Sequence, residues 1–450
     1  MKKECVLIFD IGKTNKKILL FDRQLKIHLE EEIIFPELPD EDGFPGDDIE
    51  NLENWILDTS RKYISNKDFN ICGINFATYG ATLVYLDKNG KRLTPVYNYL
   101  KPMPEGIVEK VYAAYSGKAE FCRKTASPAL GMLNAGFQAL WLKEMKAEVF
   151  SKVKSILHFP QYLSYLMTGR ESAEHTSIGC HTALWDFDLM QYHAWTDEIK
   201  SSLPDPLPVE TVFPSKVFEK NVAVGIGIHD SSASLVPYFM SSDDPFILLS
   251  TGTWCISMNP FNDEVLTSQE LENDCLSYLS IRQKAVKSSR LFSGHIHDVN
   301  VKRLSEIFGV SDSTYKKINL DLDLLAAIKK EKPMRVFFKN GVAEDFIDRS
   351  LSKSDFSGFT EAYTKLMIDL TDLTIESLRL IIPENDLTKN IYISGGFSKN
   401  SIFIHLMREE FPEKNVFTSE VTNATSVGAA MVIWKAIDPS FKFNFDLGLK

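Results

Sequence analysis

A short pattern occurs twice in this chain, 240 residues apart, and it shapes every expectation about the architecture. The apolar run Val6 to Phe9 leads into the polar turn Asp10-Ile11-Gly12-Lys13-Thr14-Asn15, and a second apolar run extends from Ile18 to Phe21. In the same way Phe246 to Leu249 leads into Ser250-Thr251-Gly252-Thr253 and then into Trp254 to Met258. Each copy predicts a β-hairpin with a glycine in its turn. Two related domains would explain the repeat, and two unrelated hairpins would explain it as well.

The length of 450 residues favours two domains, because a single core stops growing well before this size. Strand patterns at Ile71 to Ala77 and Leu83 to Leu86 alternate with helical stripes such as Tyr363, Leu366, Met367, Leu370 and Leu373. Such alternation predicts the α/β class. The polar segment Ser241-Ser242-Asp243-Asp244-Pro245 directly precedes the second copy, so we place the boundary there, between domains 1–244 and 245–450.

Charge and cysteine usage narrow the class of protein. The chain has 50 Lys and Arg against 61 Asp and Glu, a net charge of −11, and no basic cluster, so we expect no nucleic-acid partner. The six cysteines are scattered without a C-x-x-C pair, which is typical of free thiols in a reducing compartment, and we expect the cytoplasm. No run of eighteen apolar residues occurs, so we expect no membrane span.

The two glycine turns are candidate phosphate sites. Small hydroxyl residues and a glycine let backbone N–H groups approach a phosphate, while Lys13 and Lys17 add positive charge and Asp10 offers a carboxylate for a magnesium ion. The turn Ser250 to Thr253 offers hydroxyl groups without a lysine. A plain hairpin turn explains both segments equally well, and the chain contains no G-x-x-x-x-G-K-[ST] motif.

Two further junctions join a strand to a helix. The apolar strand Ile391 to Ile393 runs into Gly395-Gly396, where the missing side chains admit a phosphate or a flat ligand, or simply make a tight turn. The glycine-lined strand before His229-Asp230 ends at a carboxylate, which is either a general base or a helix N-cap.

Two other polar clusters are interpreted as structural. We expect His295-Ile296-His297-Asp298 to form a strand with both histidines on one face, without a second ligand pair for zinc. The acidic run Asp40-Glu41-Asp42, continued by Asp47, Asp48 and Glu50, predicts a solvated loop.

The order of these motifs along the chain resembles that of the FGGY carbohydrate kinases, members of the actin-like ATPase superfamily. The resemblance covers almost the whole sequence and implies two ribonuclease-H-like domains with a cleft between them. It implies ATP and Mg²⁺ as cofactors, a small-molecule sugar as partner, and a homodimer as a candidate assembly.

The resemblance also assigns candidate residues. It implies Asp230 as the catalytic base, Asp10 near the magnesium ion, and Tyr79, Gly80, Ala81, His229 and Asp230 at the sugar. It places ATP at Gly12, Lys13, Thr14, Asn15, Lys17, Thr251, Gly252, Thr253, Gly395, Gly396 and Asn400, with Gly428-Ala429-Ala430 at the adenosine end. Asp42-Gly43-Phe44 matches the family's Asp-Gly-aromatic stretch.

One departure bears on the substrate. Tyr99-Leu100-Lys101 stands where the family often has an aromatic, Arg, Asp cluster, so a sugar-contacting carboxylate is missing. The His-Asp pair is most similar to the family members that act on L-rhamnulose and L-fuculose, which makes such a ketose the expected acceptor. An actin-like ATPase that acts as a switch, and a sugar-binding protein that has lost catalysis, are the alternatives.

Overall fold

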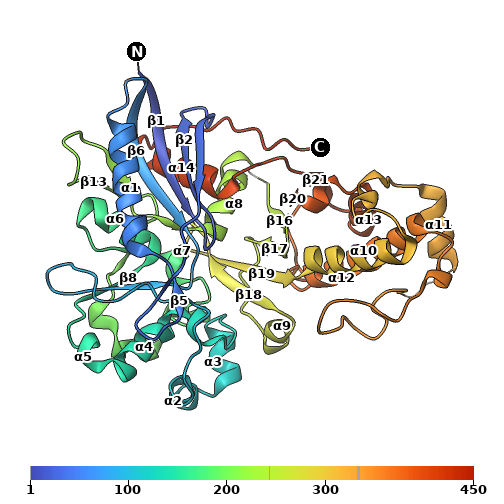
Figure 1. Cartoon of the computed structure of the whole chain (residues 1–450), viewed down its shortest axis with the longest axis horizontal. Coiled ribbons are helices and arrows are strands. Elements are labelled where there is room, and N and C mark those ends of the chain that lie inside the picture. Colours follow the sequence, from blue (N-terminus) through green and yellow to red (C-terminus); the bar gives the residue numbers. More distant parts are fainter. Residues whose placement is uncertain (1, 243, 332–334) are drawn as a thin grey trace.

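The computed structural model describes residues 2–242, 244–331 and 335–450, and its main elements are two large mixed sheets flanked by helices (Figure 1). Asp243, part of the predicted domain boundary, lies outside these residues. Within the described ranges no helix is both long and apolar enough to cross a membrane. All six cysteines are free thiols, as expected.

The first sheet is built around the first predicted hairpin, which is confirmed. Its strand β1 pairs antiparallel with β2, with Asp10 opposite Lys17, and parallel with the later strand β6. The strand order is β13-β14-β6-β1-β2-β3, and β15 adds a short pairing to β6. The bounds are β1 Lys3–Ile11, β2 Lys16–Asp22, β3 Ile27–Ile33, β6 Phe69–Thr78, β13 Val212–Pro214, β14 Ala223–Gly225 and β15 Ile228–His229.

The second sheet repeats this pairing and confirms the second hairpin. Strand β16 pairs antiparallel with β17 and parallel with the later strand β20, in the order β18-β19-β17-β16-β20-β21. The bounds are β16 Phe246–Thr251, β17 Cys255–Asn259, β18 Cys275–Leu279, β19 Ala285–Leu291, β20 Asn390–Gly395 and β21 Asn415–Thr418. Because both hairpins occupy the same place in their sheets, two related domains explain the repeat better than two unrelated hairpins.

Helices and short strands complete both halves of the chain. The stripe on α12 is confirmed as core, since Tyr363, Leu366, Met367 and Leu370 are buried, while Leu373 is half-buried. The longer helices are α1 Ile49–Ile64, α4 Ala135–Met145, α6 Phe159–Thr168, α8 Asp230–Ser241, α10 Ser293–Phe308, α11 Leu322–Glu331, α12 Phe359–Arg379, α13 Ser401–Glu410 and α14 Ala424–Ile437. The shorter elements are α2 Val108–Ala114, α3 Lys118–Lys124, α5 Ala147–Phe150, α7 His175–Ile178, α9 Ser268–Glu272, β4 Leu38–Pro39, β5 Pro45–Gly46, β7 Leu83–Leu86, β8 Ser155–His158, β9 Ala173–Glu174, β10 Trp185–Asp186, β11 Gln191–Tyr192 and β12 Pro206–Leu207.

The helix α14 follows the second sheet in the sequence but packs on the first sheet, against β1, β6 and α8 (Figure 1). Gly428 makes this approach close, because a Cβ there would lie 1.9 Å from the Ala233 carbonyl oxygen of α8. The Asn75 side chain donates to the Ala429 carbonyl at 3.0 Å. The segment predicted to bind adenosine, Gly428-Ala429-Ala430, is therefore a buried helix-packing surface.

Two structural expectations were wrong. The segment His295 to Asp298 lies in the helix α10 and not in a strand. The acidic run is only partly solvated, because the Asp40 and Asp47 side chains are 4 % and 7 % exposed and both accept from lysines. Charge pairing explains this burial, since the lysines satisfy carboxylates that would otherwise need water.

Candidate active site

The first turn places a carboxylate at the end of β1. The Gly12 N–H donates to the Asn15 carbonyl at 3.0 Å, which closes the turn and leaves Thr14 and Asn15 exposed. Asp10 accepts from the Ser426 hydroxyl at 2.6 Å, so α14 contacts this end of the sheet. Burial raises the pKa of Asp10 to about 6; the Ser426 hydrogen bond acts to lower it, and the charge of Asp230 adds to the rise.

The two lysines of this hairpin point to different partners. Lys17 lies 3.5 Å from Glu30 and 3.7 Å from Glu32 on the neighbouring strand β3, and its charge acts on Asp10. The Lys13 Nζ lies 2.9 Å from Asp47 Oδ2 and 3.2 Å from Glu37 Oε1, in the segment that leads into α1.

Asp230 is the first residue of α8, directly after the strand β15. Its Oδ1 accepts from the Ser231 N–H at 2.5 Å and lies 3.1 Å from His229 Nε2. The side chain is 36 % exposed, so the carboxylate still reaches solvent. Burial raises the pKa of Asp230 to about 6, although the Ser231 N–H and hydroxyl act to lower it.

Buried hydrogen bonds hold the backbone at this strand end. The His229 N–H donates to the Thr176 hydroxyl at 3.1 Å, and that hydroxyl donates to Glu174 at 2.7 Å. The Cys180 thiol lies 2.9 Å from His229 Nε2. Burial lowers the pKa of His229 to about 4, so its imidazole is neutral near pH 7.

The predicted sugar-facing turn lies beside His229. Tyr79, Gly80, Ala81 and His229 line one small recess of about 10 Å³, too small for a sugar. Gly80 leaves the room that His229 needs, because a Cβ there would lie 3.0 Å from the Cys180 sulfur and 3.2 Å from the imidazole. Ala81 has a φ of +60°, a conformation that is uncommon for a residue with a Cβ.

The second turn is tied to the Gly-Gly junction. The Thr251 hydroxyl donates to the Ser394 carbonyl at 2.5 Å and accepts from the Phe397 N–H at 3.0 Å. Gly395 has a φ of +87°, and a Cβ there would lie 1.9 Å from the Thr251 carbonyl oxygen. The Thr251 hydroxyl therefore holds the two segments together, which leaves Gly252, Thr253 and Gly396 exposed.

A pocket of about 550 Å³ opens at these exposed residues. It is lined by Gly252, Thr253, Gly294, His297, Asp298, Tyr315, Lys316, Ile318, Tyr363, Gly396, Phe397, Lys399 and Asn400. The Asn400 side chain caps α13 through its Oδ1, and its Nδ2 donates to the Tyr363 hydroxyl at 2.8 Å. Aromatic walls and a few polar groups are typical of a site for a flat ligand.

Several site residues were missed from the sequence. Ser426 bonds Asp10, and Thr425 lies 3.4 Å from the backbone carbonyl of Asp230, but their helix was expected to serve adenosine. Asp47 is buried and accepts from Lys13, Lys16 and the Tyr79 hydroxyl, although it was assigned to a solvated loop. The one sequence signal near Asp47 is its neighbour Asp48, which caps α1. An acidic residue directly before a helix is typical of an N-cap, and it indicates that this segment is ordered.

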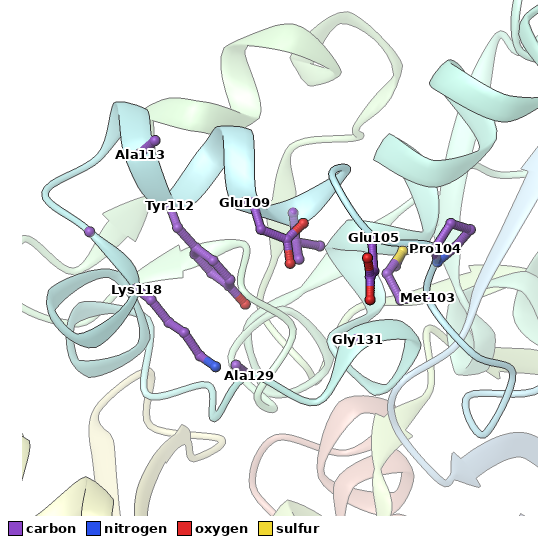
Figure 2. Close-up of a pocket in the computed structure, with 11 residues that line it drawn as sticks. Met103, Pro104, Glu105, Glu109, Tyr112, Ala113, Lys118, Ala129 and Gly131 are labelled. Carbon is purple, nitrogen blue, oxygen red and sulfur yellow. The ribbon is translucent and has the colours of Figure 1, made fainter.

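A pocket of about 610 Å³ lies elsewhere, and its walls come from α2, the start of α3 and the loops around Met103 and Gly131 (Figure 2). None of the candidate residues from the sequence lines it. It therefore plays no part in the site described above.

The two sheets, each built around an antiparallel hairpin whose first strand also pairs parallel with a later strand, define an actin-like fold. Residues 5–231 match the model for the FGGY family of carbohydrate kinases, N-terminal domain, and the chain belongs to this family of sugar kinases. A rhamnulokinase from Halalkalibacterium halodurans is 21 % identical over 96 % of this chain and 93 % of its own length.

Two other similarities agree with this assignment. A rhamnulokinase from Mannheimia succiniciproducens is 27 % identical over an alignment that covers 59 % of this chain and 56 % of that relative. A carbohydrate kinase structure from Novosphingobium aromaticivorans superposes with a TM-score of 0.81 at 23 % identity, over 100 % of this chain and 94 % of that one. At this identity the superposition shows the fold alone.

Proposed function

We propose that this protein transfers the γ-phosphoryl group of ATP to a hydroxyl of a small ketose, with L-rhamnulose and L-fuculose as the first candidates. The observation that carries the proposal is Asp230, a partly exposed carboxylate with a raised pKa, fixed beside the recess that the sugar-facing turn lines. The two relatives are named rhamnulokinases, which supports L-rhamnulose as the first acceptor to test.

In this proposal Asp230 is the general base. A sugar hydroxyl is a weak nucleophile, so a carboxylate that accepts its proton during attack on the phosphorus assists the transfer. All contacts that the described residues make to this carboxylate go to Oδ1, which leaves Oδ2 for the acceptor hydroxyl. The His229 Nε2 lies 3.1 Å from Oδ1, on the side of the carboxylate that Ser231 also contacts.

The nucleotide would lie against the second sheet. The pocket at Asn400 would hold the adenosine, and the exposed residues of the two turns and of the Gly-Gly junction, among them Asn15, Gly252 and Gly396, would face the phosphates. Lys17 would add charge from the first hairpin. Asp10 fits a magnesium ion because a carboxylate oxygen is a hard ligand, and the ion would neutralise phosphate charge when bound.

Four expectations about the whole molecule stay proposals. We place the domain boundary at 244/245, the active-site cleft between the two halves, and the protein in the cytoplasm, with a homodimer as the candidate assembly. The two turns in equivalent strands of the two sheets support the first two.

The test is a coupled assay of ADP release with L-rhamnulose, L-fuculose, D-xylulose, glycerol and D-gluconate as acceptors. We expect acceptor-dependent ADP release with at least one ketose and little without an acceptor. ATP hydrolysis that is indifferent to every acceptor would instead indicate a switch ATPase. Sugar binding without ADP release would indicate a protein that has lost catalysis.

A further inference from the structure

We propose that Lys13 binds the acceptor and not the phosphates of ATP, and that Lys13, Asp47 and Tyr99 form a face that selects a neutral polyol over a sugar acid. This inference rests on the proposed sugar kinase function. It reassigns a lysine that the sequence placed at the nucleotide.

The contacts of Lys13 lead away from the phosphate turn. Its Nζ is paired with Asp47 and Glu37, whereas Lys17, on the same hairpin, stays near Asp10 and the glutamates of β3. The Lys13 side chain is 17 % exposed, against 3 % for Lys16 and 8 % for Lys101, so it is the most open of these three lysines.

Asp47 connects Lys13 to the sugar-facing turn. Its Oδ2 accepts from both Lys13 at 2.9 Å and the Tyr79 hydroxyl at 2.7 Å, while Lys16 holds Oδ1 at 3.1 Å. These three donors outweigh burial and hold the pKa of Asp47 below its usual range. Asp47 is thus a fixed anion, and it sets Lys13 beside the residues that line the recess at His229.

Tyr99 extends this face toward the catalytic base. Its ring lies 6.0 Å from the Tyr79 ring, edge to face, and it is half-buried. Burial raises the pKa of Tyr99, and its hydroxyl also lies within electrostatic range of Lys13, Asp47, Asp230 and Glu37. A phenol at this position supplies a hydroxyl and an aromatic face.

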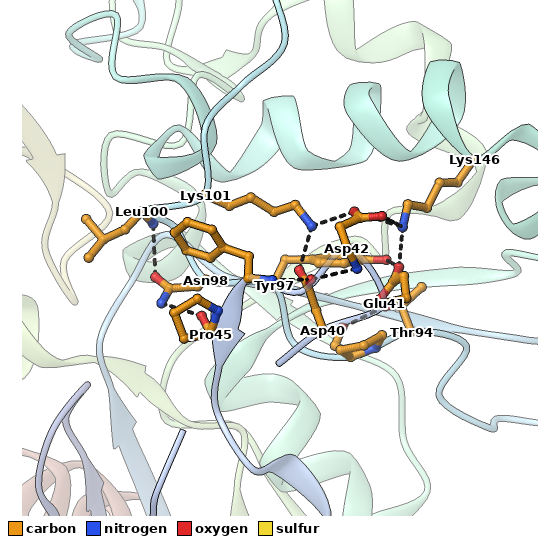
Figure 3. Close-up of polar contacts among 12 residues, drawn as sticks. Asp40, Glu41, Asp42, Pro45, Thr94, Tyr97, Asn98, Leu100, Lys101 and Lys146 are labelled. Carbon is orange, nitrogen blue, oxygen red and sulfur yellow. Dashed lines mark hydrogen bonds and ion pairs between the residues drawn. The ribbon is translucent and has the colours of Figure 1, made fainter. Parts of the chain in front are cut away.

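The next cation along the chain is not available to the acceptor. Figure 3 shows Lys101 turned toward the loop before α1, with its Nζ 2.5 Å from Asp40 and 2.6 Å from Asp42. Lys101 is buried, and its ammonium group lies 5.2 Å from the centres of the Tyr97 and Trp141 rings. Among the described residues around Tyr99, Lys13 is therefore the cation that retains an open side.

The charge balance decides the class of acceptor. Asp47, Glu37 and Asp230 carry three negative charges, against two positive charges on Lys13 and Lys16. A carboxylate on the substrate would add to this excess and be repelled. Hydroxyl groups can accept from the ammonium of Lys13 and donate to Asp47 or Glu37, so the face suits a neutral polyol.

The experiment compares Lys13→Met with Lys17→Met, using the best acceptor of the five-sugar panel. We expect Lys13→Met to raise the KM for the acceptor by about 10–100-fold, the effect of one hydrogen bond from a charged group, with the KM for ATP unchanged. Lys17→Met should raise the KM for ATP and leave the KM for the acceptor unchanged. Lys13→Arg should retain most acceptor binding. Thermal denaturation checks that both methionine variants are folded. A raised KM for ATP with an unchanged acceptor KM in Lys13→Met would overturn the assignment.

A second variant tests the selectivity. Glu37→Gln removes one carboxylate from the face, so the ratio of kcat/KM for D-gluconate to that for the best neutral sugar should rise several-fold. A wild-type preference for D-gluconate over all neutral acceptors would overturn the selectivity. If no acceptor is phosphorylated, the kinase proposal fails by itself. Calorimetry with a non-hydrolysable ATP analogue then tests whether Lys13 lies at the nucleotide. Weaker nucleotide binding by Lys13→Met would refute the assignment of Lys13 to the acceptor, and unchanged binding would support it.

Discussion

Asp230 is subject to two opposing influences. Burial raises its pKa to about 6, while the hydrogen bonds from Ser231 at the start of α8 act to lower it. The outcome is a carboxylate that is mostly ionised at pH 7 and yet basic enough to accept a proton from an alcohol during phosphoryl transfer. Its environment thus tunes the group for the proposed role.

We expect Asp230→Asn to lower kcat by about 10²–10⁴-fold, because the amide cannot accept the proton. In the wild-type protein kcat/KM should fall as the pH drops through about 6, since only the ionised carboxylate acts as a base. Steady-state ADP release from pH 5 to pH 8 measures both effects, and nucleotide calorimetry confirms that the variant is folded. Activity of Asp230→Asn within threefold of the wild type would exclude the role.

In the proposed mechanism Thr176 is a positioning residue for Asp230. Its hydroxyl accepts from the His229 N–H and donates to the buried Glu174, so it fixes the backbone next to Asp230. We expect Thr176→Val to lower kcat about tenfold or more with little change in the KM for ATP, because a small displacement of a catalytic group is costly. Thr176→Ser keeps the hydroxyl and should restore kcat. Equal losses in both variants would show that the hydroxyl is not responsible.

Single residues were predictable where the chain concentrates chemistry in a short motif. His229-Asp230 and Tyr79-Gly80-Ala81 were singled out, and the structure places all of them except Asp230 around one recess, with Asp230 adjoining His229. Thr176 and Ser426 were not found. Each acts through a hydrogen bond to a residue more than fifty positions away, and such a contact leaves no local pattern.

At the level of elements, the glycine of the second turn provides a sharp test. A Cβ at Gly252 would meet only the Trp254 carbonyl oxygen, at 3.8 Å, so the free protein has room for a side chain there. We expect Gly252→Val to weaken nucleotide binding about tenfold or more with an unchanged melting temperature, because the side chain would occupy the space of the phosphates. Calorimetry with an ATP analogue measures the first quantity. Unchanged affinity would make this turn purely structural.

The elements themselves were predictable where their period was long enough. Both hairpins were predicted correctly, because two short apolar runs separated by a polar turn with a glycine are typical of a β-hairpin. The short alternation in His295-Ile296-His297-Asp298 was misleading, since four residues cannot distinguish a period of two from one of 3.6. The burial of Ile296, Asn300, Val301 and Leu304 shows the helical period over a longer window.

For the whole molecule, the proposed site residues are divided between the two sheets. Asp10, Lys17 and Asp230 belong to the first sheet and its helix, and Gly252, Gly396 and Asn400 to the second. We expect sugar and nucleotide to bind with a positive coupling of ~1–3 kcal/mol, because the first ligand helps to order the half that the second needs.

The measurement is the dissociation constant of a non-hydrolysable ATP analogue with and without saturating sugar, together with small-angle scattering for compaction. Asp230→Asn serves as a variant in which turnover is blocked. Independent binding with no change in the radius of gyration would argue for a rigid site.

The crossing of α14 back to the first sheet determines when the site can exist during synthesis. Ser426 leaves the ribosome more than four hundred residues after Asp10, the residue to which its hydroxyl donates. The first sheet therefore cannot acquire its covering helix α14 until the second sheet has also been made. A nascent chain that lacks α14 is therefore unable to complete the proposed site around Asp10 and Asp230.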